Sequence, residues 1–384
     1  MNIFNLHGSV LSDYKTYIDS FINIADERIK AKVDESVNSG KLWPAPLIQF
    51  NPNYQPGWSV KELIERGAHP ELGHVFNGFE LYRHQTEAFE AGSSGKGFVV
   101  TSGTGSGKSL TYLSTVFDQV LKAGAPQHKT LALIVYPMNA LINSQREELM
   151  KLAINYLRSK SGLELELPPD MELKDQLANW ESATKLKFPV TFARYTGQES
   201  QADKLKVIQE PPHIILTNYS MLELMMTRSE ETKLREALFP NLRYLVFDEL
   251  HTYRGRAGSD VAMLVRRVKA KCPNKLTCIG TSATMAAVEG DGDVRAQVKK
   301  VADDFFDDEF PLECIIDEQL LAVAEPQTAV TQESVTKALK DTEASHDEEL
   351  IRSNPLTKWM EGRYVLDERM RRATPVEFQA IVAD

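Results

Sequence analysis

The chain has 384 residues, of which 42% are hydrophobic and 26% charged, a composition typical of folded, water-soluble proteins with two or three domains. Its 44 Lys and Arg residues are outnumbered by 54 Asp and Glu, and the net charge of −10 excludes a surface that coats nucleic acid through overall positive charge. The three cysteines lack the spacing of a zinc site, and no apolar run approaches the roughly 20 residues that cross a bilayer. Because the first residues also lack the pattern of a signal peptide, we expect a cytoplasmic protein without a membrane segment.

Residues 1–75 are expected to form an accessory arm. Over residues 11–38 apolar side chains recur every three or four positions, which predicts one amphipathic helix. The segment KLWPAPLIQFNPNYQPGW that follows contains four prolines and several aromatic residues, which favours an extended chain laid over a neighbouring surface.

Residues 76–325 consist of short apolar runs separated by segments of helical length. The runs are GFVVTS, TLALIVYP, FPVTFARY, HIILTNY, LRYLVFDE and KLTCIGTS. Runs rich in Val, Ile and Leu are typical of strands buried on both faces of a parallel sheet, so we predict an α/β domain with a mostly parallel sheet and helices on both faces. A polar insertion at about 158–187 is expected on the surface, and the acidic residues 326–384 are expected to be a linker or the start of a further C-terminal part.

A glycine-rich segment, SGTGSGKS, follows the first of these runs and precedes a helical pattern. It fits the GxxxxGK[ST] phosphate-binding pattern except that Ser102 replaces the first glycine. Glycines allow consecutive N–H groups to face one phosphate, Lys108 would reach the β- and γ-phosphates of a nucleotide, and the Ser109 hydroxyl would bind Mg²⁺. A flexible Gly/Ser turn is the alternative. The predicted nucleotide-binding residues of this P-loop are Ser102, Gly103, Thr104, Gly105, Ser106, Gly107, Lys108 and Ser109.

Two carboxylates end the fifth apolar run, LRYLVFDE. A strand that ends in Asp248 and Glu249 places both at the carboxyl edge of the sheet, beside the P-loop. Asp248 can then hold Mg²⁺, and Glu249 can orient and deprotonate the water that attacks the nucleotide. An acidic helix cap after a core strand is the alternative interpretation.

The segment Asp248-Glu249-Leu250-His251 resembles the DExH box of superfamily-2 helicases. Further segments resemble motifs of that family in the family's order, and together they cover roughly residues 79–285. They are LYRHQTEA (81–88) for the adenine-reading motif, YPMNALINSQ (136–145) for motif Ia, RYTGQES (194–200) for a strand contact, LTNYSMLE (216–223) for motif Ib and TSAT (281–284) for motif III. The resemblance implies a RecA-like fold, ATP and Mg²⁺ as cofactors, and Gln85 as the residue that pairs with adenine.

The segment DELHTYRGRAGSDVAMLVRRV, together with YPMNAL and LTNYSMLE, is most similar to bacterial DNA helicases of the mitomycin-repair (MrfA-like) type. It also resembles large helicases with a C-terminal DUF1998 domain from phage-defence systems such as Druantia and DISARM. This resemblance implies an ATP-dependent motor that moves on nucleic acid, with DNA a better candidate than RNA, in repair or antiphage defence. Repair or defence subunits would then be further partners.

Residues at strand-to-helix junctions can hold successive phosphates without a basic surface. On this basis the predicted nucleic-acid contacts are Asn139, Gln145, Thr196, Gly197, Thr217 and Asn218, with Arg146 and Arg194 as secondary candidates. For each of these residues a role as a turn or cap residue is an equal alternative. His251 is expected to join the ATP site to motif III, where Ser282 and Thr284 would couple nucleotide state to the grip on the strand.

Helicases of this superfamily close two RecA-like domains over one ATP, and the second domain supplies arginine fingers from a Q/HxxGRxxR motif. Nothing after residue 285 matches that motif. An arginine finger contributes about a thousandfold or more to phosphoryl transfer, so we expect weak hydrolysis by this chain alone. The second domain is expected from the rest of a longer protein or from another chain. A double-stranded DNA translocase without unwinding and a non-catalytic, nucleotide-sensing docking subunit are the alternatives.

Overall fold

A computed structural model describes residues 3–21, 24–38, 46–103, 105–124, 129–283, 294–340, 347–367, 370–377 and 380–381. Two of the predicted site residues, Thr104 and Thr284, lie outside these ranges. The chain divides into two compact units, one of residues 53–321 and one of residues 1–52 together with 322–384.

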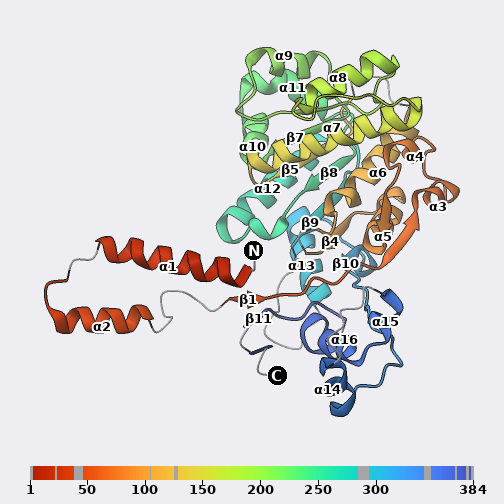
Figure 1. The fold of residues 1–384 in the computed structure, drawn as a ribbon. Coiled ribbons are helices and arrows are strands. Elements are labelled where there is room, and N and C mark those ends of the chain that lie inside the picture. The colour runs from red at the N-terminus through yellow and green to blue at the C-terminus, as the bar shows by residue number, and fades with distance from the viewer. Residues whose placement is uncertain are drawn as a thin grey trace. The chain divides into compact units, whose positions relative to one another are not determined.

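A seven-stranded parallel sheet forms the centre of the larger unit (Figure 1). Its strand order is β10-β4-β9-β8-β5-β7-β6, and every neighbouring pair is parallel. The strands are β4 (Phe98–Thr101), β5 (Ala132–Tyr136), β6 (Phe192–Arg194), β7 (Ile214–Asn218), β8 (Tyr244–Phe247), β9 (Thr277–Ser282) and β10 (Ile315–Asp317). The six apolar runs all form strands, which confirms the predicted α/β fold; β10 is an additional edge strand of three residues, too short to show in the sequence pattern.

Alternate side chains of each strand pack into two separate cores, because successive residues of a strand point to opposite faces of a sheet. In β5, Ala132, Ile134 and Tyr136 face one core, and Leu133 and Val135 face the other. The first core is completed by α5 (Arg83–Ser93), α6 (Lys108–Lys122), α7 (Asn139–Ser161) and α8 (Leu173–Thr184), and the second by α9 (Gln201–Gln209), α10 (Tyr219–Thr227), α11 (Thr232–Leu238), α12 (Gly255–Lys271) and α13 (Val294–Phe306). Helices therefore cover both faces of the sheet, as predicted.

Residues 53–75, which the sequence pattern places in the arm, group with the larger unit. They form β2 (Pro56–Ser59), α3 (Val60–Glu65) and α4 (Leu72–Val75), and β2 pairs antiparallel with β3 (Glu80–Tyr82). Leu63 and Leu72 are fully buried in the first core. Helices of four and six residues are too short to display a hydrophobic period, so the sequence gives no sign of this layer.

The segment at 158–187, expected on the surface, contributes to the same core. Helix α7 continues to Ser161, and α8 packs along it with Trp180 buried. A single aromatic side chain at the right place on a polar helix is enough to anchor it, and the charged composition of the segment conceals this contact.

The smaller unit contains α1 (Ile3–Phe21), α2 (Glu27–Asn38), α14 (Gln332–Lys340), α15 (Glu348–Ser353) and α16 (Pro355–Met360), and a strand pair of β1 (Leu47–Ile48) with β11 (Val376–Glu377). The prediction of one helix over residues 11–38 is wrong, because two helices cover this range. Asp26 explains the break: its Oδ1 accepts hydrogen bonds from the backbone N–H groups of Arg28 (2.9 Å) and Ile29 (3.3 Å) and so caps a new helix. Among the described residues no helix is long and apolar enough to cross a membrane.

Candidate functional site

The P-loop connects β4 to α6 and turns sharply through two glycines. Gly105 and Gly107 have φ angles of 80° and 69°, in the left-handed region that favours glycine. Helix α6 then begins at Lys108, so its N-terminal N–H groups face the loop. The Ser102 and Ser106 hydroxyls are buried and 2.6 Å apart, which explains the departure from glycine at position 102: Ser102 closes the loop with a side-chain hydrogen bond.

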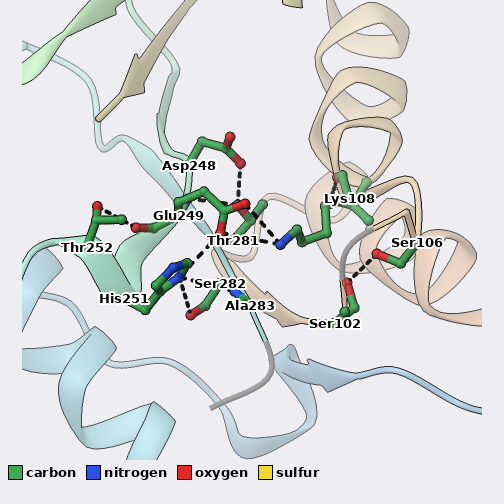
Figure 2. A network of polar contacts seen from close by, with 12 residues as sticks. Ser102, Ser106, Lys108, Asp248, Glu249, His251, Thr252, Thr281, Ser282 and Ala283 are labelled. Carbon is green, nitrogen blue, oxygen red and sulfur yellow. Dashed lines mark hydrogen bonds and ion pairs between the residues drawn. The ribbon is translucent and has the colours of Figure 1, made fainter. Parts of the chain in front are cut away.

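Lys108 and Glu249 form an ion pair between the P-loop and the end of β8 (Figure 2). The Lys108 Nζ lies 3.1 Å from Glu249 Oε1 and 3.3 Å from Oε2, and the two side chains are only 11% and 23% exposed. Glu249 has a φ of 54°, a left-handed conformation that is strained for a residue other than glycine and that recurs at functional sites. The structure thus brings the predicted phosphate-binding lysine against the predicted catalytic acid.

Asp248 lies beside this pair and is almost entirely buried, at 7% exposure. The Thr281 hydroxyl donates a hydrogen bond to Asp248 Oδ1 and accepts one from the Glu249 backbone N–H (3.2 Å). Burial raises the pKa of Asp248 to about 6, and the neighbouring Glu249 carboxylate adds to the rise, while the Thr281 hydroxyl and Lys108 oppose it. A carboxylate held in this way is destabilised when charged, and a bound cation would relieve that cost.

Thr281 is a site residue that the motif comparison did not single out. It is the first residue of TSAT, and it points from β9 toward β8 because the two strands are neighbours in the sheet. One helical crossover separates β9 from β8 in the sequence, and residues that end adjacent parallel strands meet at one edge of a sheet. Knowledge of the strand order would therefore have identified Thr281.

His251 contacts both the acidic motif and the end of β9 (Figure 2). Its Nδ1 accepts a hydrogen bond from the Ala283 backbone N–H at 3.2 Å and lies 3.4 Å from the Ser282 hydroxyl. The same nitrogen is 3.3 Å from Glu249 Oε2. One imidazole therefore touches both the predicted catalytic acid and motif III.

Gln85, predicted to read adenine, supports the P-loop in this structure. Its Nε2 donates to the carbonyls of Ser106 (3.3 Å) and Gly107 (3.1 Å), and its Oε1 accepts from the Tyr82 backbone N–H (2.9 Å). Both amide hydrogens are therefore engaged by the loop. A contact of Gln85 with adenine stays a prediction that would use the remaining lone pair of Oε1 or a rearranged side chain.

His84 is a second P-loop support that the sequence did not reveal. Its Nε2 lies 3.0 Å from the Ser106 carbonyl, and its buried Nδ1 has no hydrogen-bond partner among the described residues. Burial lowers the pKa of His84, which favours a neutral ring whose Nε2–H donates to Ser106. The predicted Gln85 and the adjacent His84 thus hold one turn of the P-loop together.

The predicted nucleic-acid residues lie where β5, β6 and β7 end. Asn218 Nδ2 donates to Asn139 Oδ1 (2.7 Å), and Asn218 Oδ1 caps α10 through the Met221 N–H (2.7 Å). Gln145 is partly exposed, and Gly197 is exposed with open space around it. These four residues are accessible to a ligand at the same edge of the sheet.

Two of the predicted contacts, Thr196 and Thr217, have buried side chains instead. The Thr217 hydroxyl donates to the Tyr195 carbonyl at 2.7 Å, and the Thr196 hydroxyl donates to Glu199 at 2.6 Å. Both hydroxyls are turned inward and stabilise the ends of β6 and β7, so the structure does not offer them to a strand. This is the turn-residue alternative that the sequence left open.

Two arginines stand beside this edge. Arg194 pairs with Glu199 (3.3 Å) and donates to Asn143 Oδ1. Arg146 forms no hydrogen bond or ion pair with another described residue, and burial together with the positive charge of Arg194 lowers its pKa. A partly buried guanidinium beside a second one is a favourable place for an anion.

A cavity of about 530 Å³ lies at the opposite, amino edge of the sheet, where Leu131, Tyr244 and Leu276 begin or precede strands. It contains none of the predicted site residues. The P-loop chemistry is therefore not located in this cavity.

The family model of the DEAD/DEAH box helicases matches residues 82–290, which is more than half of the chain. The chain belongs to this family. The predicted helicase family is thereby confirmed. The matched range contains the P-loop, the acidic motif and the end of β9.

Two curated proteins are similar to this chain over more than half of its length. The Druantia protein DruE of Escherichia coli (strain UMEA 4076-1) is 28% identical over 388 residues, covering 76% of this chain and 21% of DruE. The uncharacterized ATP-dependent helicase YprA of Bacillus subtilis (strain 168) is 33% identical over 210 residues, covering 54% of this chain and 23% of YprA. The chain thus spans less than a quarter of the length of either relative.

Solved structures of helicases share the fold. The DUF1998 helicase MrfA bound to DNA matches with a TM-score of 0.50 and 25% identity, over 71% of this chain and 30% of MrfA. Mss116p bound to single-stranded RNA and AMP-PNP also has a TM-score of 0.50, at 16% identity, over 82% of this chain and 55% of Mss116p. The similarity to MrfA confirms the predicted resemblance to helicases of that type.

Proposed function

We propose that this chain is the ATP-binding half of a motor that uses ATP hydrolysis to move on DNA. The observation that carries the proposal is the contact of Lys108 with Glu249 beside the buried Asp248, at the start of α6. A lysine at a helix N-terminus and two carboxylates at the end of a neighbouring strand are groups that enzymes use for phosphoryl transfer to water.

We infer that a bound nucleotide would change the partners of this ion pair. In this structure Glu249 pairs with Lys108. A triphosphate in the P-loop would attract the Lys108 ammonium, and Glu249 would be released to orient a water molecule and accept its proton. The same exchange of partners therefore binds the substrate and prepares the catalytic base.

The donor set fits Mg²⁺. Asp248 supplies a hard carboxylate oxygen and Ser109 a hydroxyl, and Mg²⁺ bound with nucleotide usually takes one or two protein oxygens and completes its shell with phosphate and water. When bound, Mg²⁺ would neutralise phosphate charge, and Thr281 would hold Asp248 in place through its hydroxyl.

Nucleotide state would reach the DNA through His251. Release of Glu249 from Lys108 would move the Glu249 carboxylate, which lies 3.3 Å from His251 Nδ1. The same nitrogen contacts the Ala283 N–H, just after the end of β9. We propose that Ser282 and Thr284 pass this change to the strand contacts, which comprise Asn139, Gln145, Gly197, Asn218 and Arg146.

DNA is the proposed track because the similar MrfA structure is bound to DNA. Antiphage defence is a proposed process because of the similarity to a Druantia protein, and repair is the other because of the resemblance to MrfA-like repair helicases. A second RecA-like domain, from the rest of a longer protein or from another chain, would supply the arginine fingers. The test is strand displacement by a protein that contains both domains, with Glu249→Gln as the control. Unwinding that requires ATP and Glu249 supports the helicase, whereas DNA-stimulated hydrolysis without unwinding would assign a double-stranded DNA translocase.

A further inference from the structure

A short segment that starts at the last residue of β10, Asp317–Leu321, runs beside the P-loop; we call it the strap. It begins in register with the end of β4, where Asp317 pairs with Thr101 and the Glu318 N–H donates to the Thr101 carbonyl at 3.0 Å. The Thr101 hydroxyl also donates to Asp317. The strap is therefore fixed to the residue that immediately precedes the P-loop.

Glu318 reaches from the strap into the loop itself. Its Oε2 accepts a hydrogen bond from the Gly103 backbone N–H at 2.8 Å, and Gly103 is buried. The preceding N–H, that of Ser102, donates to the Ser282 carbonyl of β9 at 3.2 Å. Strand β9 and Glu318 thus hold two successive N–H groups and determine how the chain leaves β4.

The strap is also tied to the helix that supports the other end of the P-loop. Gln319 Nε2 donates to Glu87 Oε2 at 3.0 Å, and Glu87 belongs to α5. The same helix carries Gln85, which holds the Ser106 and Gly107 carbonyls. Both ends of the P-loop therefore depend on contacts that converge on the strap and α5.

The two ends of the larger unit meet at this place. Leu321 N–H donates to the Asn53 carbonyl at 2.7 Å, Gln55 N–H donates to the Gln319 carbonyl at 2.8 Å, and Tyr54 and Leu320 form an antiparallel bridge. Both points where the chain passes between the two units, 52–53 and 321–322, thus adjoin one hydrogen-bonded pair of segments.

We propose that Glu318 is a positioning residue of the nucleotide site, which holds Gly103 so that the P-loop is open for phosphate, and that the strap transmits changes at the two ends of the unit to this loop. The proposal rests on the proposed binding of ATP by the P-loop. A carboxylate beside a phosphate site repels the anionic ligand. The proposal therefore requires that the hydrogen bond to Gly103 favours the free energy of binding by more than this repulsion opposes it.

The test compares variants of this chain by equilibrium binding of a fluorescent ATP analogue with Mg²⁺ and by thermal unfolding without nucleotide. We expect Glu318→Ala to weaken binding about tenfold, because it removes a charge-assisted hydrogen bond, and to leave unfolding within a few degrees of wild type. Glu318→Gln keeps an acceptor oxygen and should bind within about threefold of wild type. Gln319→Ala, which loses only the bond to α5, should weaken binding about threefold.

Two control variants separate the possible failures. Glu313→Ala removes an exposed acid just before β10 that pairs with Lys96 at 3.5 Å, and it should leave affinity unchanged. Lys108→Ala should weaken binding by about a hundredfold, and if it does not, the proposed ATP site fails rather than the role of Glu318.

Hydrogen exchange at Gly103 supplies a readout that general destabilisation does not move. The Gly103 amide should exchange faster in Glu318→Ala, while amides of β5 and β8 stay protected. Wild-type or tighter binding by Glu318→Ala would overturn the proposal, the latter because Glu318 would then be an inhibitory contact. Equal losses in Glu318→Ala and Glu318→Gln would also overturn it, and wild-type binding by Gln319→Ala would remove the role of the strap.

Discussion

Two groups of residues lie at the same edge of one sheet, yet their polar side chains make different kinds of contact. The nucleotide cluster is Lys108, Asp248 and Glu249, and the strand-contact cluster is Asn139, Gln145, Arg146, Gly197 and Asn218. In the nucleotide cluster, Lys108 and Glu249 contact each other across elements, and Asp248 is buried with a raised pKa. In the strand-contact cluster, Asn218 bonds to the neighbouring Asn139 and to the Met221 backbone N–H that begins α10.

This difference separates groups held for a ligand from groups that stabilise the fold. A ligand can replace the Lys108–Glu249 contact without disturbing any backbone hydrogen bond. Replacement of Asn218 would remove the cap of α10 as well as any contact with DNA. Substitutions in the first cluster should therefore affect function without loss of stability, and those in the second should combine the two effects.

The largest effect is expected for Glu249→Gln. Loss of a general base typically reduces the rate by about 10²–10⁴-fold, while the amide leaves Lys108 free to bind phosphate. Single-turnover hydrolysis of labelled ATP should show this loss with no decrease in ATP affinity. An unchanged rate would assign the base to another residue and would favour a non-catalytic, nucleotide-sensing subunit.

Lys108→Ala should weaken binding of Mg²⁺-ATP by about a hundredfold, because it removes a charge-assisted contact with the phosphates. Isothermal titration measures the change. Lys122→Ala is the matched control: this lysine lies at the other end of α6 and pairs with Asp118, so its loss should leave ATP affinity unchanged.

Asp248→Asn should stabilise the nucleotide-free protein while it abolishes hydrolysis. The pKa of about 6 in the folded protein lies above the ordinary 3.8, so the folded state binds this proton more tightly than the unfolded chain does. The stability contributed by the protonated carboxyl is complete below pH 3.8 and is lost as the pH rises through about 6.

At pH 7.5 the free energy of unfolding of Asp248→Asn should therefore exceed that of wild type by up to about 2–3 kcal/mol. The gain should shrink below pH 6, where the wild-type carboxyl takes up its proton. Urea denaturation at pH 7.5 and pH 5 measures both values, and a gain that does not depend on pH would contradict the raised pKa.

The smallest effect is expected at the strand contacts. Arg146→Ala should weaken binding of single-stranded DNA about three- to tenfold and lower the salt dependence by about one phosphate contact. Arg158→Ala, at the far end of the same helix, is the control and should change neither. Fluorescence anisotropy at several salt concentrations would show whether Arg146 contacts phosphate or only packs against Arg194.

Continuous sequence segments predicted the fold and the centre of the nucleotide site. The six apolar runs form strands because their hydrophobic content shows locally, and the P-loop and the acidic motif contain all of their distinctive residues within a few positions. The break at Asp26 and the short helices α3 and α4 were missed, because a single capping residue or one helical turn leaves no period.

Contacts between distant residues were not accessible to the sequence. Gly103 and Glu318 are separated by 215 positions, and Thr281 meets Asp248 only because β9 lies next to β8. Gln85 was singled out through its motif, but its bonds to two P-loop carbonyls depend on how α5 packs against α6. The inward orientation of Thr217 likewise depends on β6 lying beside β7, because its hydroxyl donates to the Tyr195 carbonyl.

The most direct test of the ATP site is a crystal structure of this chain with Mg²⁺ and a non-hydrolysable ATP analogue. We predict that the Lys108 Nζ moves from Glu249 to the β- and γ-phosphates and that Mg²⁺ lies between Ser109 and Asp248. An analogue bound elsewhere on the chain, with the Lys108–Glu249 ion pair intact, would contradict the account.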